Sequence, residues 1–223
     1  MTEKDNEKLF EPIWQNVYDR LSKDIIEMNI STDQTISETR IASELGVSRS
    51  PVRTALEKLA SEGLIEKKED GTYKMVPLSA EECRALCTAR CCIEGEAAAL
   101  AAKRINAEQL ERLKTLIIEM REMQKARDFS RFPPVDQEFH QIVMEASGNR
   151  FLQQMLEQLK QQIQRYRHFK YRLNPSDLSD LLDTQHIAIY QCLKNRMGEA
   201  AKAEMINDIS SMNVFSGYIM KYY

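Results

Sequence analysis

The sequence lacks the features that would direct a protein to a membrane or out of the cell. It contains no run of about 18 uncharged apolar residues, which a membrane-spanning helix requires. Its first residues, MTEKDNEKLFEP, contain no apolar core of a secretion signal. The five cysteines are odd in number, which argues against a disulfide framework. We therefore expect a cytoplasmic protein that makes no contact with a membrane.

An excess of positive charge is also missing. The formal net charge is −3, and residues 1–77 contain 11 lysines and arginines against 15 aspartates and glutamates. Any binding of nucleic acid by this region must therefore come from a local basic patch. Glycine and proline are scarce, at seven and six residues, and 43% of the 223 residues are hydrophobic. These values are typical of a globular chain with room for a small and a medium domain.

Residues 36–76 have the pattern of a winged helix-turn-helix. Ser37 is placed to cap a short amphipathic helix, and Gly46 supplies the permissive backbone that the following turn needs. Ser48 repeats the cap for a second helix, where Pro51 falls in the first turn and its missing N–H costs nothing. Gly63 ends this helix, and a hairpin turning at residues 69–71 follows.

The polar face of the second helix is the part suited to reading DNA. Arg49 and Arg53 are four residues apart near its start, which is the end that a recognition helix points at base edges. Lysines on or beside the hairpin are placed to reach phosphates. These are Lys67, Lys68 and Lys74. By pattern alone, a helix-turn-helix also occurs in helical bundles that do not touch DNA.

The string ELGVSRSPVRTALEKLASEGLIE closely resembles the DNA-reading helix of the GntR family of bacterial transcriptional regulators. The resemblance covers about 40 residues and implies that the operator-facing residues lie on the second helix and its flanks. Family members often carry an arginine where this chain has Thr39, and Arg40 either substitutes for it or is solvated. The predicted DNA-binding residues are Thr39, Arg40, Ser48, Arg49, Ser50, Arg53 and Lys74.

The remaining chain has no pattern typical of β-strands and is predicted to form successive amphipathic helices. Ser79 and Glu82 form a predicted capping box at the start of the first of them. The predicted helices span about residues 79–103, 107–125, 133–147, 149–172, 176–195 and 197–220. We therefore predict a mainly α protein, with a winged helix-turn-helix at residues 1–77 and an all-helical effector-binding and dimerisation domain at residues 78–223.

Two of the three histidines occur in patterns that suit a cation. Asp136 and His140 are four residues apart, so both project from one helix face and can bind one metal. His186 and Asp208 lie on later predicted helices. By spacing alone, a hydrogen-bonded Asp-His pair without a metal is the commoner arrangement.

The helical half looks like the FCD effector domain of the FadR subfamily of GntR regulators. The pattern of that domain is Asp-x-x-x-His followed by two further histidines, and Asp136, His140 and His186 match in type and order. Asp208 stands where the last histidine is usual, which gives a harder and more anionic ligand set. The resemblance thus implies a divalent metal, zinc, nickel or manganese, at a four-residue site, or a degenerate site that is empty.

Arg90 matches an arginine of the same domain, and Glu94 follows one turn later. The resemblance implies that Arg90 binds the carboxylate of an effector, and a buried ion pair with Glu94 is the alternative. Cys83, Cys87 and Cys91 form a stripe at helical spacing that suits a soft metal or oxidation sensing, although packing as small apolar residues is the more common role.

These observations predict a ligand-responsive transcriptional regulator rather than an enzyme. The resemblance implies a homodimer on a palindromic double-stranded DNA operator, with a small carboxylate as effector. One alternative is a metal sensor in which the cation itself is the signal. Another is a metal-dependent hydrolase with a DNA-binding head, although the sequence contains no HExxH motif and no evident general base.

Overall fold

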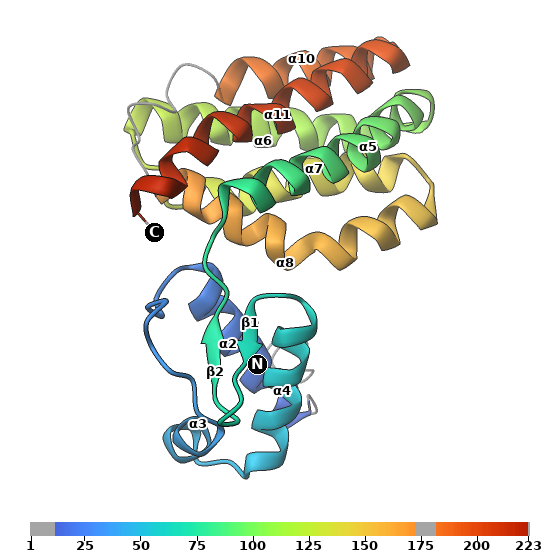
Figure 1. Ribbon diagram of the computed structural model, residues 1–223. Helices are drawn as coiled ribbons and strands as arrows, with labels where there is room; N and C mark the ends of the chain where they lie inside the picture. Colours follow the sequence, from blue (N-terminus) through green and yellow to red (C-terminus); the bar gives the residue numbers. More distant parts are fainter. Residues whose placement is uncertain (1–11, 173–181, 223) are drawn as a thin grey trace. The chain divides into compact units, whose positions relative to one another are not determined.

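The computed structural model describes residues 12–172 and 182–222 (Figure 1). The chain divides into two compact units, Met1–Pro77 and Leu78–Tyr223. Among the described residues, no helix is both long and apolar enough to cross a membrane. The predicted fold class is confirmed, because a winged helix-turn-helix is followed by a unit whose described residues form helices and no strand.

In the described part of the N-terminal unit, three helices pack against a two-stranded antiparallel hairpin. Its elements are α2 (Ile13–Ile26), α3 (Glu38–Leu45), α4 (Arg49–Ser61), β1 (Ile65–Lys67) and β2 (Tyr73–Met75). Ile65 pairs with Met75 and Lys67 with Tyr73 in the hairpin, and Tyr73 also bridges to Ile36 before α3. The apolar stripe of α4 is fully buried in this core and therefore fixes which face of the helix is exposed.

Local sequence explains the corner between α3 and α4. Gly46 ends α3 in the left-handed conformation, at φ 65°, which is accessible to glycine without steric cost. Ser37 and Ser48 occupy the predicted N-cap positions in extended conformation, but neither hydroxyl accepts a hydrogen bond from the first turn. The serines therefore mark the helix starts without capping them, and water can solvate the exposed amides.

The C-terminal unit is a bundle of long helices. Its elements are α5 (Ala80–Arg104), α6 (Ala107–Ala126), α7 (Phe132–Ala146), α8 (Arg150–Arg172), α10 (Leu182–Lys194) and α11 (Gly198–Tyr222). The predicted start of the fifth helix, near residue 176, lies outside the described residues. α11 runs along α5 (Figure 1), and Gly95 makes the close approach possible, because a Cβ there would lie 3.0 Å from Ile206.

The predicted capping box at the start of α5 is only half formed. The Ser79 hydroxyl accepts from the Glu82 amide at 3.3 Å, but the Ser79 amide donates to the Tyr166 hydroxyl at 3.2 Å instead of to Glu82. The Tyr166 hydroxyl in turn donates to the Ser79 carbonyl at 3.1 Å. A long-range contact therefore replaces the local one and ties the start of α5 to α8.

Candidate nucleic-acid interface and candidate metal centre

A concave surface of the N-terminal unit lies between α4 and the β1–β2 hairpin, which is the wing of this fold. It encloses about 370 Å³ between the starts of α3 and α4 and the hairpin. Thr39, Arg49 and Arg53 line it from the helices, and Lys67 and Thr72 line it from the wing. Arg49 and Arg53 are exposed, at 61% and 55% of their side chains, so both guanidiniums are accessible to a ligand.

Glu38 holds these two arginines, a contact that the sequence did not predict. Its carboxylate is only 8% exposed and accepts from Arg49 Nη2 at 3.3 Å and from Arg53 Nε and Nη2 at 3.2 Å each. The hydrogen bonds from Arg53 lower the pKa of the Glu38 carboxyl, although burial opposes this shift. Glu38 lies 11 and 15 residues before its partners, so no helical periodicity connects them.

The other predicted DNA-binding residues are exposed but differ in their contacts. Ser48 and Ser50 lie at the start of α4, and Lys74 lies on the exposed side of β2. Arg40 forms an exposed pair with Glu44 one turn later, at 3.2 Å. The structure thus places Thr39, Arg49 and Arg53 in one concave surface, and Arg40 and Lys74 are not among the residues that line it.

Glu38→Gln is expected to destabilise the N-terminal unit by about 1 kcal/mol at pH 7, because the arginines lose an anionic partner that water partly screens. The folded-state pKa of Glu38 is lowered, so its stabilising effect is present above the unfolded carboxyl pKa and is lost as pH falls through the folded value. The unfolding free energies of wild type and variant should therefore converge below about pH 4.

Urea unfolding of the full chain, followed by the fluorescence of Trp14, measures this difference, because the single tryptophan packs against the N-terminal core. Glu44→Gln is the control in an exposed pair, and a difference that persists at low pH would contradict the assignment.

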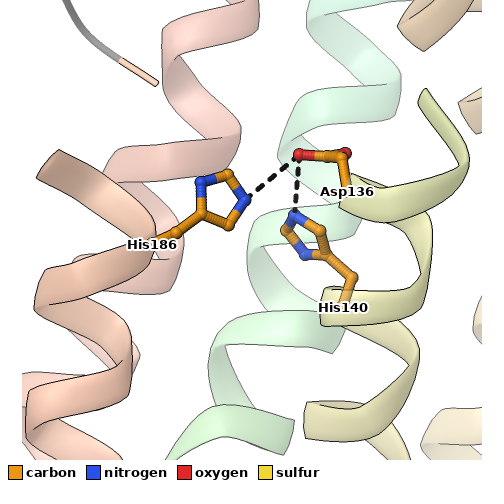
Figure 2. A group of neighbouring side chains, drawn as sticks. All are labelled: Asp136, His140 and His186. Atoms are coloured by element: carbon orange, nitrogen blue, oxygen red, sulfur yellow. Dashed lines mark hydrogen bonds and ion pairs between the residues drawn. The ribbon is translucent and has the colours of Figure 1, made fainter. Parts of the chain in front are cut away.

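In the C-terminal unit, three of the predicted metal ligands lie together. Asp136, His140 and His186 each direct a ligand atom to one point, and these atoms lie within 4.8 Å of one another (Figure 2). Asp136 and His140 come from one face of α7, and His186 comes from α10. His186 Nε2 lies 3.1 Å and His140 Nε2 lies 3.9 Å from Asp136 Oδ1. All three residues are buried.

Asp208 reaches the same place from α11. Its Oδ2 atom lies 3.2 Å from His140 Nε2, and the side chain is buried. The four predicted ligands, which are spread over 73 residues, are thus neighbours. Figure 2 shows the two imidazoles approaching Asp136 from different helices.

Three further side chains orient this cluster. Glu94 accepts from His140 Nδ1 at 2.7 Å, which directs His140 Nε2 toward Asp136 and Asp208. Burial disfavours protonation of His140, but the nearby Glu94 and Asp208 outweigh it and raise its pKa to about 9. Arg167 Nε pairs with Asp136 Oδ2, and the Tyr171 hydroxyl donates to Asp136 Oδ1 at 3.4 Å.

The chemistry of this donor set fits a divalent transition metal. Two imidazoles and two carboxylates in a buried setting are ligands that zinc, nickel and manganese accept. Glu94 provides the outer hydrogen bond that metal-binding histidines usually have. Arg167 competes with a metal, because its guanidinium already pairs with Asp136, and so does the proton that the raised pKa favours on His140.

Arg90 lies beside the cluster and forms an ion pair with the Glu94 carboxylate. Its Nε donates to Glu94 Oε1 at 2.6 Å, and both side chains are buried, so the ion pair that the sequence left open is present. Arg90 also lines a cavity of about 10 Å³ together with Asp136 and Asp208. A cavity of this size holds about one water molecule. The contact between Arg90 and an effector stays a prediction.

Arg90→Ala is expected to destabilise the C-terminal unit by about 3–5 kcal/mol, because it leaves Glu94 buried without its main cationic partner. The ion pair between Arg112 and Glu138 is about 40% exposed. Arg112→Ala should therefore lower the free energy of unfolding by no more than about 1 kcal/mol. Thermal unfolding of both variants by circular dichroism compares the two. Equal losses would show that the Arg90 pair is not buried in solution.

The cysteine stripe packs against its neighbours. Cys83 and Cys87 are buried, and Cys91 Sγ lies 3.7 Å from Ser210 Oγ on α11. The hydrogen bond from the Cys83 thiol lowers the pKa of Cys87 to about 7 although burial opposes this shift. Cys91 therefore contributes to the contact between α5 and α11, and Cys83 and Cys87 are buried side chains of α5.

Two protein-family models match the chain. The family model described as "FCD domain" matches residues 85–211, which is more than half of the chain, and the model "Bacterial regulatory proteins, gntR family" matches residues 14–73. The two matches correspond to the unit with the buried cluster and to the unit with the recognition helix. Fold and family together define a DNA-binding transcriptional regulator. The chain belongs to the GntR family of bacterial regulatory proteins, in the group that carries an FCD domain.

Individual relatives are similar over most of their length. The HTH-type transcriptional repressor RspR of Escherichia coli is 27% identical over 205 residues, which cover 91% of this chain and 88% of that protein. LutR, an HTH-type transcriptional regulator of Bacillus subtilis, is 27% identical and covers 83% of this chain and 93% of its own. The families and relatives are regulators and not enzymes, so the hydrolase alternative is wrong.

Solved structures share the fold. The structure of E. coli McbR/YncC superposes with a TM-score of 0.77 at 20% identity and covers 96% of this chain and 100% of that one. A GntR regulator from Rhodococcus gives a TM-score of 0.70 at 20% identity and covers 94% and 98% of the two chains. At this identity, the likeness concerns the fold alone.

Proposed function

We propose that this protein is a metal-containing, ligand-responsive regulator that binds a palindromic operator as a homodimer and responds to a small carboxylate. The observation that supports this proposal is the buried cluster of Asp136, His140 and His186, with Asp208 beside it. The cluster belongs to the helical unit, whereas the exposed arginines belong to the DNA-binding unit. One chain thus carries both a sensing site and a readout site.

In the DNA complex, Arg49 and Arg53 contact base edges. Each guanidinium can pair bidentately with guanine, and Glu38 presents both from the start of α4. Thr39, Ser48 and Ser50 lie beside them, and the exposed Arg40 and Lys74 contact phosphates. A two-fold dimer places two such helices in major grooves one helical turn apart, which requires an inverted repeat. Occupancy of such an operator represses transcription.

In the helical unit, Asp136, His140, His186 and Asp208 hold a divalent cation. When bound, the cation supplies a Lewis-acidic position for a carboxylate oxygen. Glu94 holds His140 in orientation, and Arg90 neutralises Glu94. Zinc, nickel and manganese all suit the donor set, and Asp208 in place of an imidazole favours the harder cations among them.

Regulation follows from differential affinity. α5 carries Arg90 and Glu94 and begins three residues after Pro77, so a movement of this helix acts directly on the connection to the DNA-binding unit. An effector changes operator affinity only to the extent that it binds the two arrangements unequally. Small carboxylates that do not discriminate between them will bind without effect.

Operator selection tests the proposal. The full chain is used to select duplexes from a random pool, and mobility shifts of the selected sequence are measured with and without carboxylates and metal. We expect an inverted repeat, a stoichiometry of two chains per duplex by light scattering, and a ligand-dependent shift. A selected site without two-fold symmetry, bound by one chain, would contradict the homodimer.

A metal sensor is the second candidate, and the cavity of about 10 Å³ at the cluster favours it, because the space fits an ion but no organic acid. In this case, operator affinity changes on titration with zinc, nickel or manganese alone. A response that requires an organic ligand excludes this candidate.

A further inference from the structure

Two cysteines of α5 are in contact with each other and belong to neither of the sites described above. Cys83, Cys87 and Cys91 follow one another at intervals of four residues, so they share one side of the helix. Cys83 and Cys87 are each only 2% exposed. The Cys83 thiol donates a hydrogen bond to the Cys87 sulfur. The two sulfurs are therefore close enough to hold one ion between them.

The helix spacing suits a bridging ion better than a disulfide. Side chains four positions apart on a helix have Cβ atoms about 5–6 Å apart, whereas a disulfide brings its Cβ atoms to about 3.5–4.5 Å. Cys83 and Cys87 belong to one continuous helix, Ala80–Arg104, which a disulfide would distort. A cation between the sulfurs spans more distance, because it adds two metal–sulfur bonds of about 2.3 Å each.

The number of available ligands selects the kind of cation. In the described ranges 12–172 and 182–222, the only group of three or more potential ligand side chains that converge is Asp136, His140 and His186. Cys83 and Cys87 therefore offer a two-ligand site. Zinc takes four ligands in tetrahedral geometry, which this pair does not supply. Cuprous ion, Cu(I), is a soft cation that prefers thiolates and accepts two of them in line.

The surroundings suit the charge of such a complex. Two thiolates and one Cu(I) carry one net negative charge, and a buried anion needs cations or hydrogen bonds around it. Arg90 on α5 and Lys170 on α8 are buried beside Cys87. The hydrogen bond from Cys83 lowers the pKa of the Cys87 thiol to about 7, and the charges of Arg90 and Lys170 act in the same direction, although burial opposes them.

The position of the pair gives an ion a route to it. Cys83 is the fourth residue of α5, and its neighbours Glu82 and Arg84 are exposed. The ends of helices open locally at a small free energy, so the two thiols become accessible without unfolding of the bundle.

We propose that Cys83 and Cys87 bind one Cu(I) ion as a linear complex with two thiolates. This inference goes beyond the proposed function, because it uses neither the DNA-reading arginines nor the four predicted ligands of the Asp136 cluster. The bound ion links two adjacent turns of α5, which begins three residues after Pro77. Copper therefore stabilises the end of α5 that is connected to the DNA-binding unit.

Competition with the copper chelator bathocuproine disulfonate tests the site in the reduced full chain under nitrogen. We expect wild type to retain one Cu(I) per chain at chelator concentrations that remove it from Cys83→Ala and from Cys87→Ala. Removal of an outer-shell partner typically lowers metal affinity by about 10- to 100-fold, and loss of one of only two ligands should lower it by more. Cys92→Ala, which removes an exposed thiol of the same helix, is the control and should retain the ion. Equal retention of copper by wild type and Cys87→Ala would overturn the proposal.

X-ray absorption spectroscopy of the copper-loaded wild type tests the ligands without any variant. We expect two sulfur donors and no nitrogen donor around Cu(I). Nitrogen donors would place the ion at the histidines of the Asp136 cluster, and a third sulfur would add Cys91 or another thiol to the site. Either result would overturn the two-thiolate complex.

Discussion

Reversing the charge of both Arg49 and Arg53 to glutamate is expected to lower affinity for the selected operator by more than about 100-fold. Each bidentate arginine–guanine contact contributes about 1–3 kcal/mol of discrimination, and two new carboxylates in addition repel the phosphates. The effect should be large because both side chains lie on one exposed surface beside the wing. Competition mobility shifts with the operator and with a scrambled duplex measure it.

A milder variant separates recognition from charge. Arg53→Lys keeps the positive charge but cannot reproduce the two parallel hydrogen bonds of a guanidinium. Binding to the scrambled duplex should change little, whereas preference for the operator should fall. If the double charge reversal leaves selective binding intact, α4 is not the helix that reads DNA.

The second large effect is the loss of metal binding in His186→Ala. In wild type, we expect a metal at about 100-fold above its dissociation constant to stabilise the fold by about 2.7 kcal/mol, because the ligand cluster exists only in the folded chain. His186 is buried and contributes one of the clustered ligand atoms, so the variant should lose this metal-induced shift. Thermal melts with and without zinc, nickel and manganese, compared with melts in chelator, measure the difference.

The chain offers a matched control for this experiment. His168 is the only other histidine besides the two in the cluster, so His168→Ala should keep the full metal-induced shift. Asp208→His restores the histidine that is usual in the family and should tighten zinc binding relative to manganese, since imidazole is the softer donor. An unchanged metal preference in Asp208→His would place Asp208 outside the coordination shell.

The parts of the molecule that depend on neighbouring residues were predictable. Gly46 at the corner follows from local backbone preferences, and Arg49 and Arg53 share a face because the apolar stripe of α4 must be buried. Only half of the predicted capping box at Ser79 forms, because the Ser79 amide donates its hydrogen bond to the hydroxyl of Tyr166, 87 residues away. The local capping rule predicted the Ser79 hydroxyl contact but not the partner of the Ser79 amide, which comes from a distant part of the chain.

Long-range packing explains what was not predicted. Glu38 contacts Arg49 and Arg53 only because the Gly46 corner brings α3 and α4 together, and no neighbouring residue in the sequence marks Glu38 as their partner. Arg167 belongs to a basic run on α8 whose charges, in sequence, are typical of a solvated face. The bundle buries it against Asp136 instead.

The sequence by itself determined the elements and their chemistry, because helix periodicity and turn residues act over a few positions. It placed Asp136 and His140 on one face of one helix for the same reason. Only the tertiary structure decided which distant groups complete the site. The packing of α5, α8, α10 and α11 around α7 brought Glu94, Arg167, His186 and Asp208 to those two residues. It also set the size of the cavity at this cluster to about 10 Å³, because cavity volume depends on how whole helices pack and not on any local pattern.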